Sequence, residues 1–168
     1  MMPPRHHVFP TTIHDPAGGT PTKGAADIDT ADPRNRPVPD AGTIVLVLAG
    51  FETPDTVLLV AVHEMLAWWR RHYQALNAGT ADGRAEDLIA FGAFLIDGDV
   101  QSLLGNPPTT SSRVPSRTYG QVAASVVRGF VQLQISRETP CTDFDPASLA
   151  ADIEALDVLA DEIRDARA

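Results

Sequence analysis

The sequence has very little cysteine and fewer basic than acidic residues, and each shortage excludes a class of structure or partner. Cys141 is the only cysteine, so neither an internal disulfide nor a cysteine-cluster metal site is possible. Acidic residues outnumber basic ones by 22 to 13, which gives a formal net charge of −9. Because nonspecific binding to DNA or RNA depends on Lys and Arg neutralising phosphates, we expect no nucleic-acid partner.

Long apolar runs are also missing. None approaches the roughly 18 to 20 residues that a membrane-spanning helix needs, and prolines and histidines stand where a signal peptide would have its apolar segment. We therefore expect no membrane association and a cytoplasmic location. Lys23 is the sole lysine, which indicates codon usage of a GC-rich genome and a bacterial or phage source.

Residues 1–40 contain eight of the 14 prolines and almost no periodic apolar pattern. Such a segment cannot bury enough surface to offset its ordering entropy, so we predict a flexible arm followed by a single helical domain over 41–168. The arm could also order on a partner or a neighbouring subunit, and Val8, Phe9 and Ile13 are its candidate contacts.

The stretch 53–77 gives the clearest helical signal. Thr53 is a candidate N-cap, and Pro54 suits the first helical position because the N–H it lacks has no partner there. At 100° per residue both tryptophans, Trp68 and Trp69, fall on one broad apolar arc. We predict a core helix from residue 54 to residue 77.

Three further helices are predicted from start signals and apolar spacing. They span about 83–104 after Asp82, 118–137 with a Thr118–Gln121 capping box, and 146–166 after Asp145 and Pro146. The last helix has a narrow apolar stripe, and its other faces are acidic. A stripe of this kind packs on its own core or meets a partner chain, and Asp157 and Asp161 are its candidate partner contacts.

The predicted fold class is mainly α, a compact bundle of about four helices. The alternative is an α+β fold whose small sheet is formed by 42–50, 91–104 and 130–136. Periodicity cannot decide whether the short apolar run 42–50 is strand or helix, and Asp97-Gly98 between apolar segments is a hairpin signal.

Signals for catalysis are weak. His63-Glu64 resembles the start of a zinc-binding HExxH helix, but Ala67 stands where the second histidine is required. Glu64, Arg71 and His72 lie along an edge of the same helix, so that His63, Glu64, Arg71 and His72 form the candidate functional patch. No serine-nucleophile motif is present, and we expect no metal and no cofactor.

Three functional hypotheses fit these features. The first is a non-enzymatic interaction or assembly protein that contacts a protein partner, or itself, through the arm and the acidic C-terminal helix. The second is a small enzyme or ligand-binding domain with a pocket near the candidate functional patch. The third is an acidic inhibitor or mimic that binds a basic partner.

Overall fold

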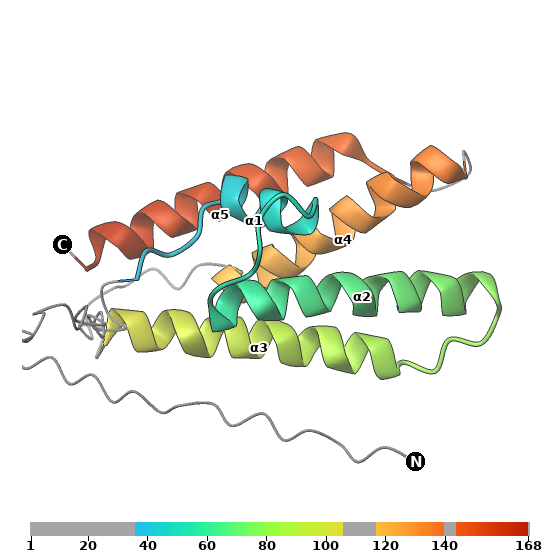
Figure 1. The fold of residues 1–168 in the computed structure, drawn as a ribbon, viewed down its shortest axis with the longest axis horizontal. Helices are drawn as coiled ribbons and strands as arrows, with labels where there is room; N and C mark the ends of the chain where they lie inside the picture. The colour runs from blue at the N-terminus through green and yellow to red at the C-terminus, as the bar shows by residue number, and fades with distance from the viewer. Residues whose placement is uncertain (1–35, 106–116, 140–143, 168) are drawn as a thin grey trace, which may run out of the picture.

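The computed structural model describes residues 36–105, 117–139 and 144–167, and all regular structure within these ranges is helical. The five helices are α1 (Ala41–Leu48), α2 (Val57–Asn77), α3 (Arg84–Leu104), α4 (Tyr119–Glu138) and α5 (Pro146–Asp165) (Figure 1). The predicted helical bundle is confirmed. Helix is found in all three segments of the alternative sheet, so the α+β prediction is wrong for the described residues. The described residues do not include four residues considered above, namely Val8, Phe9, Ile13 and Cys141.

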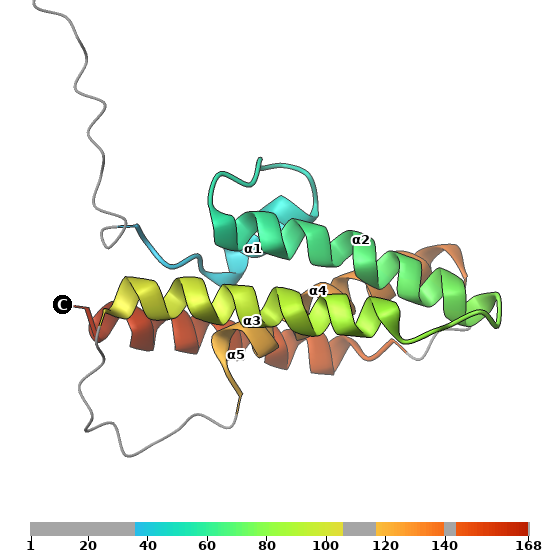
Figure 2. The same cartoon turned by 90° about the horizontal axis from the view of Figure 1, so that it is seen from below.

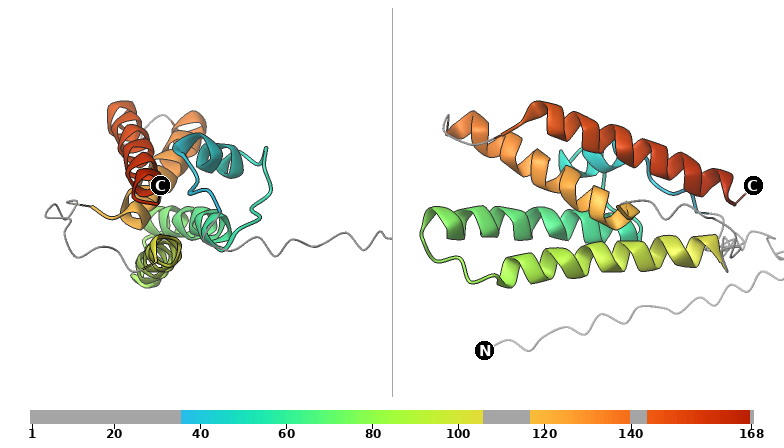
Figure 3. Two further views of the ribbon diagram at one scale, coloured as in Figure 1. Left: turned by 90° about the vertical axis from the view of Figure 1, so that its left-hand side faces the viewer. Right: turned by 180° about the vertical axis from the view of Figure 1, so that it is seen from behind.

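The helices are arranged around an antiparallel pair formed by α2 and α3 (Figure 1). α4 packs against both members of this pair, and α5 packs along α4. The short α1 lies between α2 and α5. In the end view α3 occupies the edge of the bundle farthest from α1 and α5 (Figure 3). Within the described part of the chain, no helix is long and apolar enough to cross a membrane.

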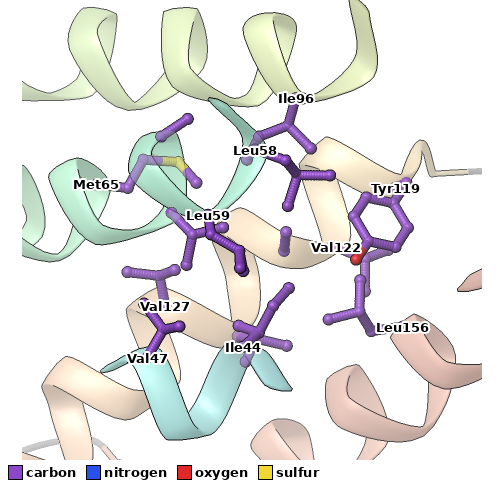
Figure 4. Close-up of a cluster of buried hydrophobic side chains, with 14 of the residues drawn as sticks. Ile44, Val47, Leu58, Leu59, Met65, Ile96, Tyr119, Val122, Val127 and Leu156 are labelled. Carbon is purple, nitrogen blue, oxygen red and sulfur yellow. The ribbon is translucent and has the colours of Figure 1, made fainter. Parts of the chain in front are cut away.

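All five helices contribute side chains to one hydrophobic core (Figure 4). Burial of this apolar surface is the main favourable contribution to folding. The largest fully buried side chains include Ile44 and Val47 of α1, Leu58 and Met65 of α2, Ile96 of α3, Val122 and Val127 of α4, and Leu156 of α5.

Three of the predicted helix starts agree with the structure, and one does not. The Thr118 hydroxyl and the Gln121 side chain form the predicted capping box of α4, and Asp145 caps α5 immediately before Pro146. α2, however, begins at Val57, with Thr56 as its N-cap, so the predicted start after Thr53 is wrong. Residues 49–56 form the connection between α1 and α2, so the Thr53-Pro54 signal lies outside the helix.

Two helix N-termini are capped by carboxylates from distant parts of the chain. Asp157 of α5 accepts a hydrogen bond of 2.8 Å from the Ala41 N–H at the start of α1. Asp97 of α3 accepts hydrogen bonds from the Gly120 N–H at 2.7 Å and from the Thr118 hydroxyl at 2.6 Å. Because free N–H groups and the helix dipole favour an anion at this end, both carboxylates fasten one helix to another.

The last residues of the predicted arm are packed on the helical domain. Val38 is 2% exposed, and the Tyr119 hydroxyl donates a 2.5 Å hydrogen bond to the Pro39 carbonyl. Burial raises the pKa of Tyr119 far above its usual value, so the hydroxyl remains a donor at every physiological pH. Arg167 donates a 2.6 Å hydrogen bond to the Arg36 carbonyl. The packed domain therefore begins a few residues before Ala41.

The cap of α1 makes stability depend on pH. The Thr43 N–H donates to the Asp40 carboxylate and holds the pKa of that carboxyl below its usual value. A carboxyl with a lowered pKa in the folded state stabilises the protein above its unfolded pKa, and this contribution is lost as pH falls through the folded pKa. We expect the difference in unfolding free energy between wild type and Asp40→Ala to be constant above about pH 5 and to shrink between about pH 4 and pH 2.

Urea denaturation at a series of pH values measures this difference. Asp82→Ala is the control, because the exposed Asp82 carboxylate also accepts one local backbone hydrogen bond, from the Arg84 N–H at 3.1 Å, but Asp82 precedes the N-cap Gly83 of α3. A difference for Asp40→Ala that persists unchanged at the lowest pH would contradict the assigned role of the carboxylate.

Candidate functional site

The outer side of α3 exposes three large apolar side chains. Phe91 is 54% exposed, Phe94 is 70% exposed and Leu95 is 39% exposed; we call these three residues the α3 face. No charged residue lies between Leu88 and Ile96. Seen from below the bundle, α3 is the helix nearest the viewer, so none of the other described helices covers its outer side (Figure 2). A contiguous apolar surface of this kind marks an interaction site in many soluble proteins.

Close helix crossings fix this orientation of α3. A Cβ atom added to Gly92 would lie 2.8 Å from Met65 Cγ of α2, and one added to Gly120 of α4 would lie 2.1 Å from the Ala93 carbonyl oxygen. The inner side of α3 therefore has to present its small residues to α2 and α4. Rotating α3 to bury Phe91 would drive side chains into these crossings, so the aromatic residues remain outside.

The predicted functional patch is not brought together into one site. His63, Glu64 and Arg71 are exposed on α2, whereas the side chain of His72 is only 12% exposed and points toward Glu86 of α3, with Nε2 3.7 Å from Oε1. Helical spacing puts Glu64 and Arg71 on one edge of α2 and His63 on the other. Within the described residues, no hydrogen bond or ion pair joins any two of the four. The functional role of this patch stays a prediction.

His72 belongs instead to an aromatic cluster at the end of α2. Its ring contacts Trp69 edge to face, with centroids 5.4 Å apart, and Tyr73 stacks on Trp69 at 5.8 Å. The Arg128 guanidinium of α4 lies 5.7 Å from the centroid of the Trp69 ring, and Arg128 Nε is 3.4 Å from the Tyr73 hydroxyl. Such contacts stabilise the α2–α4 junction, since a cation over an aromatic ring contributes about 0.5 to 1 kcal/mol at an exposed site.

A polar hollow of about 350 Å³ lies between α4 and α5. Two arginines and two aspartates, Arg117, Arg128, Asp145 and Asp152, are among its lining residues. Arg117 is paired with Asp152 at 2.7 Å and donates to Ser125. Both guanidinium groups are thus engaged within the protein and the charges balance, so the hollow has the character of a polar helix junction.

No family model, curated protein or solved structure matches this chain. In the part of the chain that the structure describes, no group of three or more His, Cys, Asp or Glu side chains is placed to hold a metal ion.

The two predicted acidic contacts of α5 differ in their surroundings. Asp157 holds the N-terminus of α1, as described above, whereas the partner of Asp161 among the described residues is Arg164, one turn along the same helix. The exposed Asp161–Arg164 ion pair contributes little to folding stability, because both charges stay solvated.

This difference gives a direct prediction for two neighbouring carboxylates. We expect Asp157→Ala to lower the free energy of unfolding by about 1 kcal/mol, the usual loss when an N-cap acceptor is removed, and Asp161→Ala to change it by less than about 0.5 kcal/mol. Urea denaturation followed by circular dichroism measures both. Equal effects of the two substitutions would show that Asp157 does not hold α1.

The α3 face was not anticipated as a site by sequence reasoning. The signal that could have found it is the helical wheel of 84–104, on which Phe91, Phe94 and Leu95 point away from the row of Ile89, Ile96 and Val100 that is buried. An amphipathic helix normally places polar residues on that outer side.

Proposed function

We propose that this protein is a non-enzymatic helical interaction protein that binds another polypeptide chain through the α3 face. The observation that carries this proposal is the exposure of Phe91 and Phe94 in the middle of a helix, with no charged residue between Leu88 and Ile96. Aromatic residues are enriched, and charged residues are depleted, at the centres of protein interfaces.

The amount of apolar surface supports binding of moderate strength. Phenylalanine offers roughly 200 Å² of surface, so the exposed parts of the two rings amount to roughly 250 Å². At about 25 cal/mol per Å², covering them would contribute about 6 kcal/mol before the entropic costs of association are subtracted. Contacts around the two rings must supply the rest of the binding free energy, as is usual around a small hot spot.

The acidic helix α5 is a weaker candidate for the main contact. Leu156 and Ala160 of its apolar stripe are buried in the core, and Asp157 is hydrogen-bonded to α1. Val158 is 52% exposed but stands among charged neighbours. The α3 face is larger, is uncharged at its centre and is not covered by any other described helix, and for these reasons we place the principal contact there.

Site-specific photo-crosslinking in the cells that naturally produce the protein tests the proposal. A photoreactive phenylalanine analogue at position 91 is expected to form covalent adducts with a polypeptide chain, identified by mass spectrometry. The matched control has the same analogue at position 51, where Phe51 is 80% exposed on the turn before α2. Adducts at position 91 no more abundant than those at position 51 would overturn the proposal.

A further inference from the structure

We infer that residues 5–14 of the predicted arm bind in a groove between α4 and α5 of the same chain. The groove is a second surface of the bundle, so the inference goes beyond the proposed function and does not depend on the α3 face. It follows from the residues that line the groove, from the charges of the two segments, and from the place where Arg36 is held.

The groove lies along one side of α5 and has a volume of about 510 Å³. Its α5 residues recur every three or four positions, which places them on one side of the helix. Most of the lining is apolar and consists of Val122 of α4 with Ala151, Ala155, Val158 and Leu159 of α5. Val158 is 52% exposed. An apolar segment bound here would therefore cover a valine that none of the described residues buries.

The charge of the groove is negative. α5 contains six Asp or Glu residues and one Arg, and Glu154 and Glu162 are the two acids that line the groove. Both are exposed, and among the described residues neither forms an ion pair. Arg117 also lines the groove but is paired with Asp152 at 2.7 Å. The groove therefore offers two carboxylates to basic side chains.

Residues 5–14 have the complementary composition. They include Arg5, three histidines and no Asp or Glu, and their large apolar side chains are those of Val8, Phe9 and Ile13. Residues 15–35, by contrast, contain four aspartates against two basic residues. The basic and apolar part of the arm is thus confined to its first 14 residues, which matches an apolar groove with acidic residues along it.

Arg36 is held near one end of this groove. Arg167 donates a 2.6 Å hydrogen bond to the Arg36 carbonyl, so the described chain starts beside the C-terminal end of α5 (Figure 1). Glu162 lies about 8 Å along the helix from Arg167, and Ala151 about 17 Å beyond it. A linker as long as residues 14–36 has an average span of roughly 26 Å. It can reach the whole groove, and such a short connection makes even a weak contact favourable.

Photo-crosslinking within the full chain tests the inference. A photoreactive phenylalanine analogue replaces Phe9, and the adducts are mapped by mass spectrometry. We expect adducts of monomer mass that join position 9 to residues 151–162. Val158→Arg should lower their yield about fivefold, because it replaces an apolar contact by a charge of the same sign as the arm. Val60→Arg is the matched control, since Val60 is 45% exposed on α2, and should leave the yield unchanged. Circular dichroism confirms that both variants are folded.

The charges give a second test that leaves the apolar lining intact. Histidine becomes protonated near pH 6.5, so the positive charge of residues 5–14 rises as the pH falls. The adduct yield after brief irradiation is expected to be about twofold higher at about pH 5.5 than at about pH 7.5. Glu154→Gln combined with Glu162→Gln should remove this increase. Asp161→Asn is the matched control, because Asp161 is exposed on the same helix but pairs with Arg164, and should preserve it.

Other results would overturn the inference. Adducts of dimer mass would mean that the groove binds the arm of a second copy. Adducts that map to α3, or that are spread over the chain as in urea-denatured protein, would mean that residues 5–14 do not bind in the groove. Equal losses in Val158→Arg and Val60→Arg, or an increase at low pH that survives the double glutamine variant, would contradict the assigned contacts.

Discussion

Gly120→Ala is expected to destabilise the bundle by about 4 kcal/mol, a large share of the 5 to 15 kcal/mol of a typical domain. The added methyl group would lie 2.1 Å from the Ala93 carbonyl oxygen. That oxygen belongs to the backbone of α3, which cannot yield as a flexible side chain can, so α3 and α4 must separate. Overpacking typically costs about 1 to 3 kcal/mol, and separation also weakens the hydrogen bond from the Gly120 N–H to Asp97.

Urea denaturation of wild type and Gly120→Ala, followed by circular dichroism, measures this loss. Gly42→Ala is the matched control, since a Cβ atom there would lie 3.4 Å from its nearest neighbour, Asp40 Oδ1, at ordinary contact distance. We expect the control to stay within about 1 kcal/mol of wild type and to gain stability if it changes at all. A Gly120→Ala midpoint equal to that of the control would contradict so close a crossing.

Leu156→Ala is expected to lower the free energy of unfolding by about 3 kcal/mol. Leu156 is 0% exposed and reaches from α5 into the core near Tyr119 and Val122 of α4 (Figure 4). Truncating a buried leucine removes its transfer free energy and leaves a cavity, which together cost about 2 to 5 kcal/mol. Thermal and urea denaturation both measure the loss.

The matched control for Leu156 lies two residues further along α5. Val158 is 52% exposed, so Val158→Ala is expected to change the free energy of unfolding by less than about 0.5 kcal/mol. Both substitutions truncate an apolar side chain of α5 to alanine. They differ in how deeply that side chain is buried. Equal losses would mean that α5 does not present Leu156 to the core.

Local signals in the sequence were sufficient to predict most of the helices. The capping box at Thr118 and the Asp145-Pro146 signal each depend on three or four adjacent residues. Each predicts one helix start. At the start of α2 two such signals compete, at Thr53 and at Thr56, and the structure uses Thr56 as the N-cap. Start signals therefore predict that a helix exists more reliably than where it begins.

Long-range contacts account for what the sequence did not reveal. The run 42–50 is helical over α1 because Asp157, far along the chain, and Asp40 both satisfy N–H groups at its start. Asp97 beside Gly98 gave a hairpin signal, yet its carboxylate caps α4. Propensity and periodicity describe neighbours in sequence, and they cannot show which distant helix a side chain will reach.

The candidate site was hidden for a related reason. Exposed phenylalanines on α3 are explained by the crossings at Gly92 and Gly120, and these depend on where α2 and α4 lie. The missing side chain of Gly92 admits Met65 and Trp68 of α2. The sequence pattern did not show which side of α3 would remain uncovered as a result.

The position of α1 beside α5 also constrains the order of folding. The hydrogen bond from the Ala41 N–H to Asp157 spans 116 positions in the chain, whereas α2 and α3 meet across a short turn. Contacts between close segments form early, and those of high contact order must wait. During translation α1 emerges from the ribosome before its capping carboxylate exists. The hydrogen bond between α1 and α5 therefore forms only after α5 has been synthesised, whereas the packing of α1 on α2 does not have to wait for it.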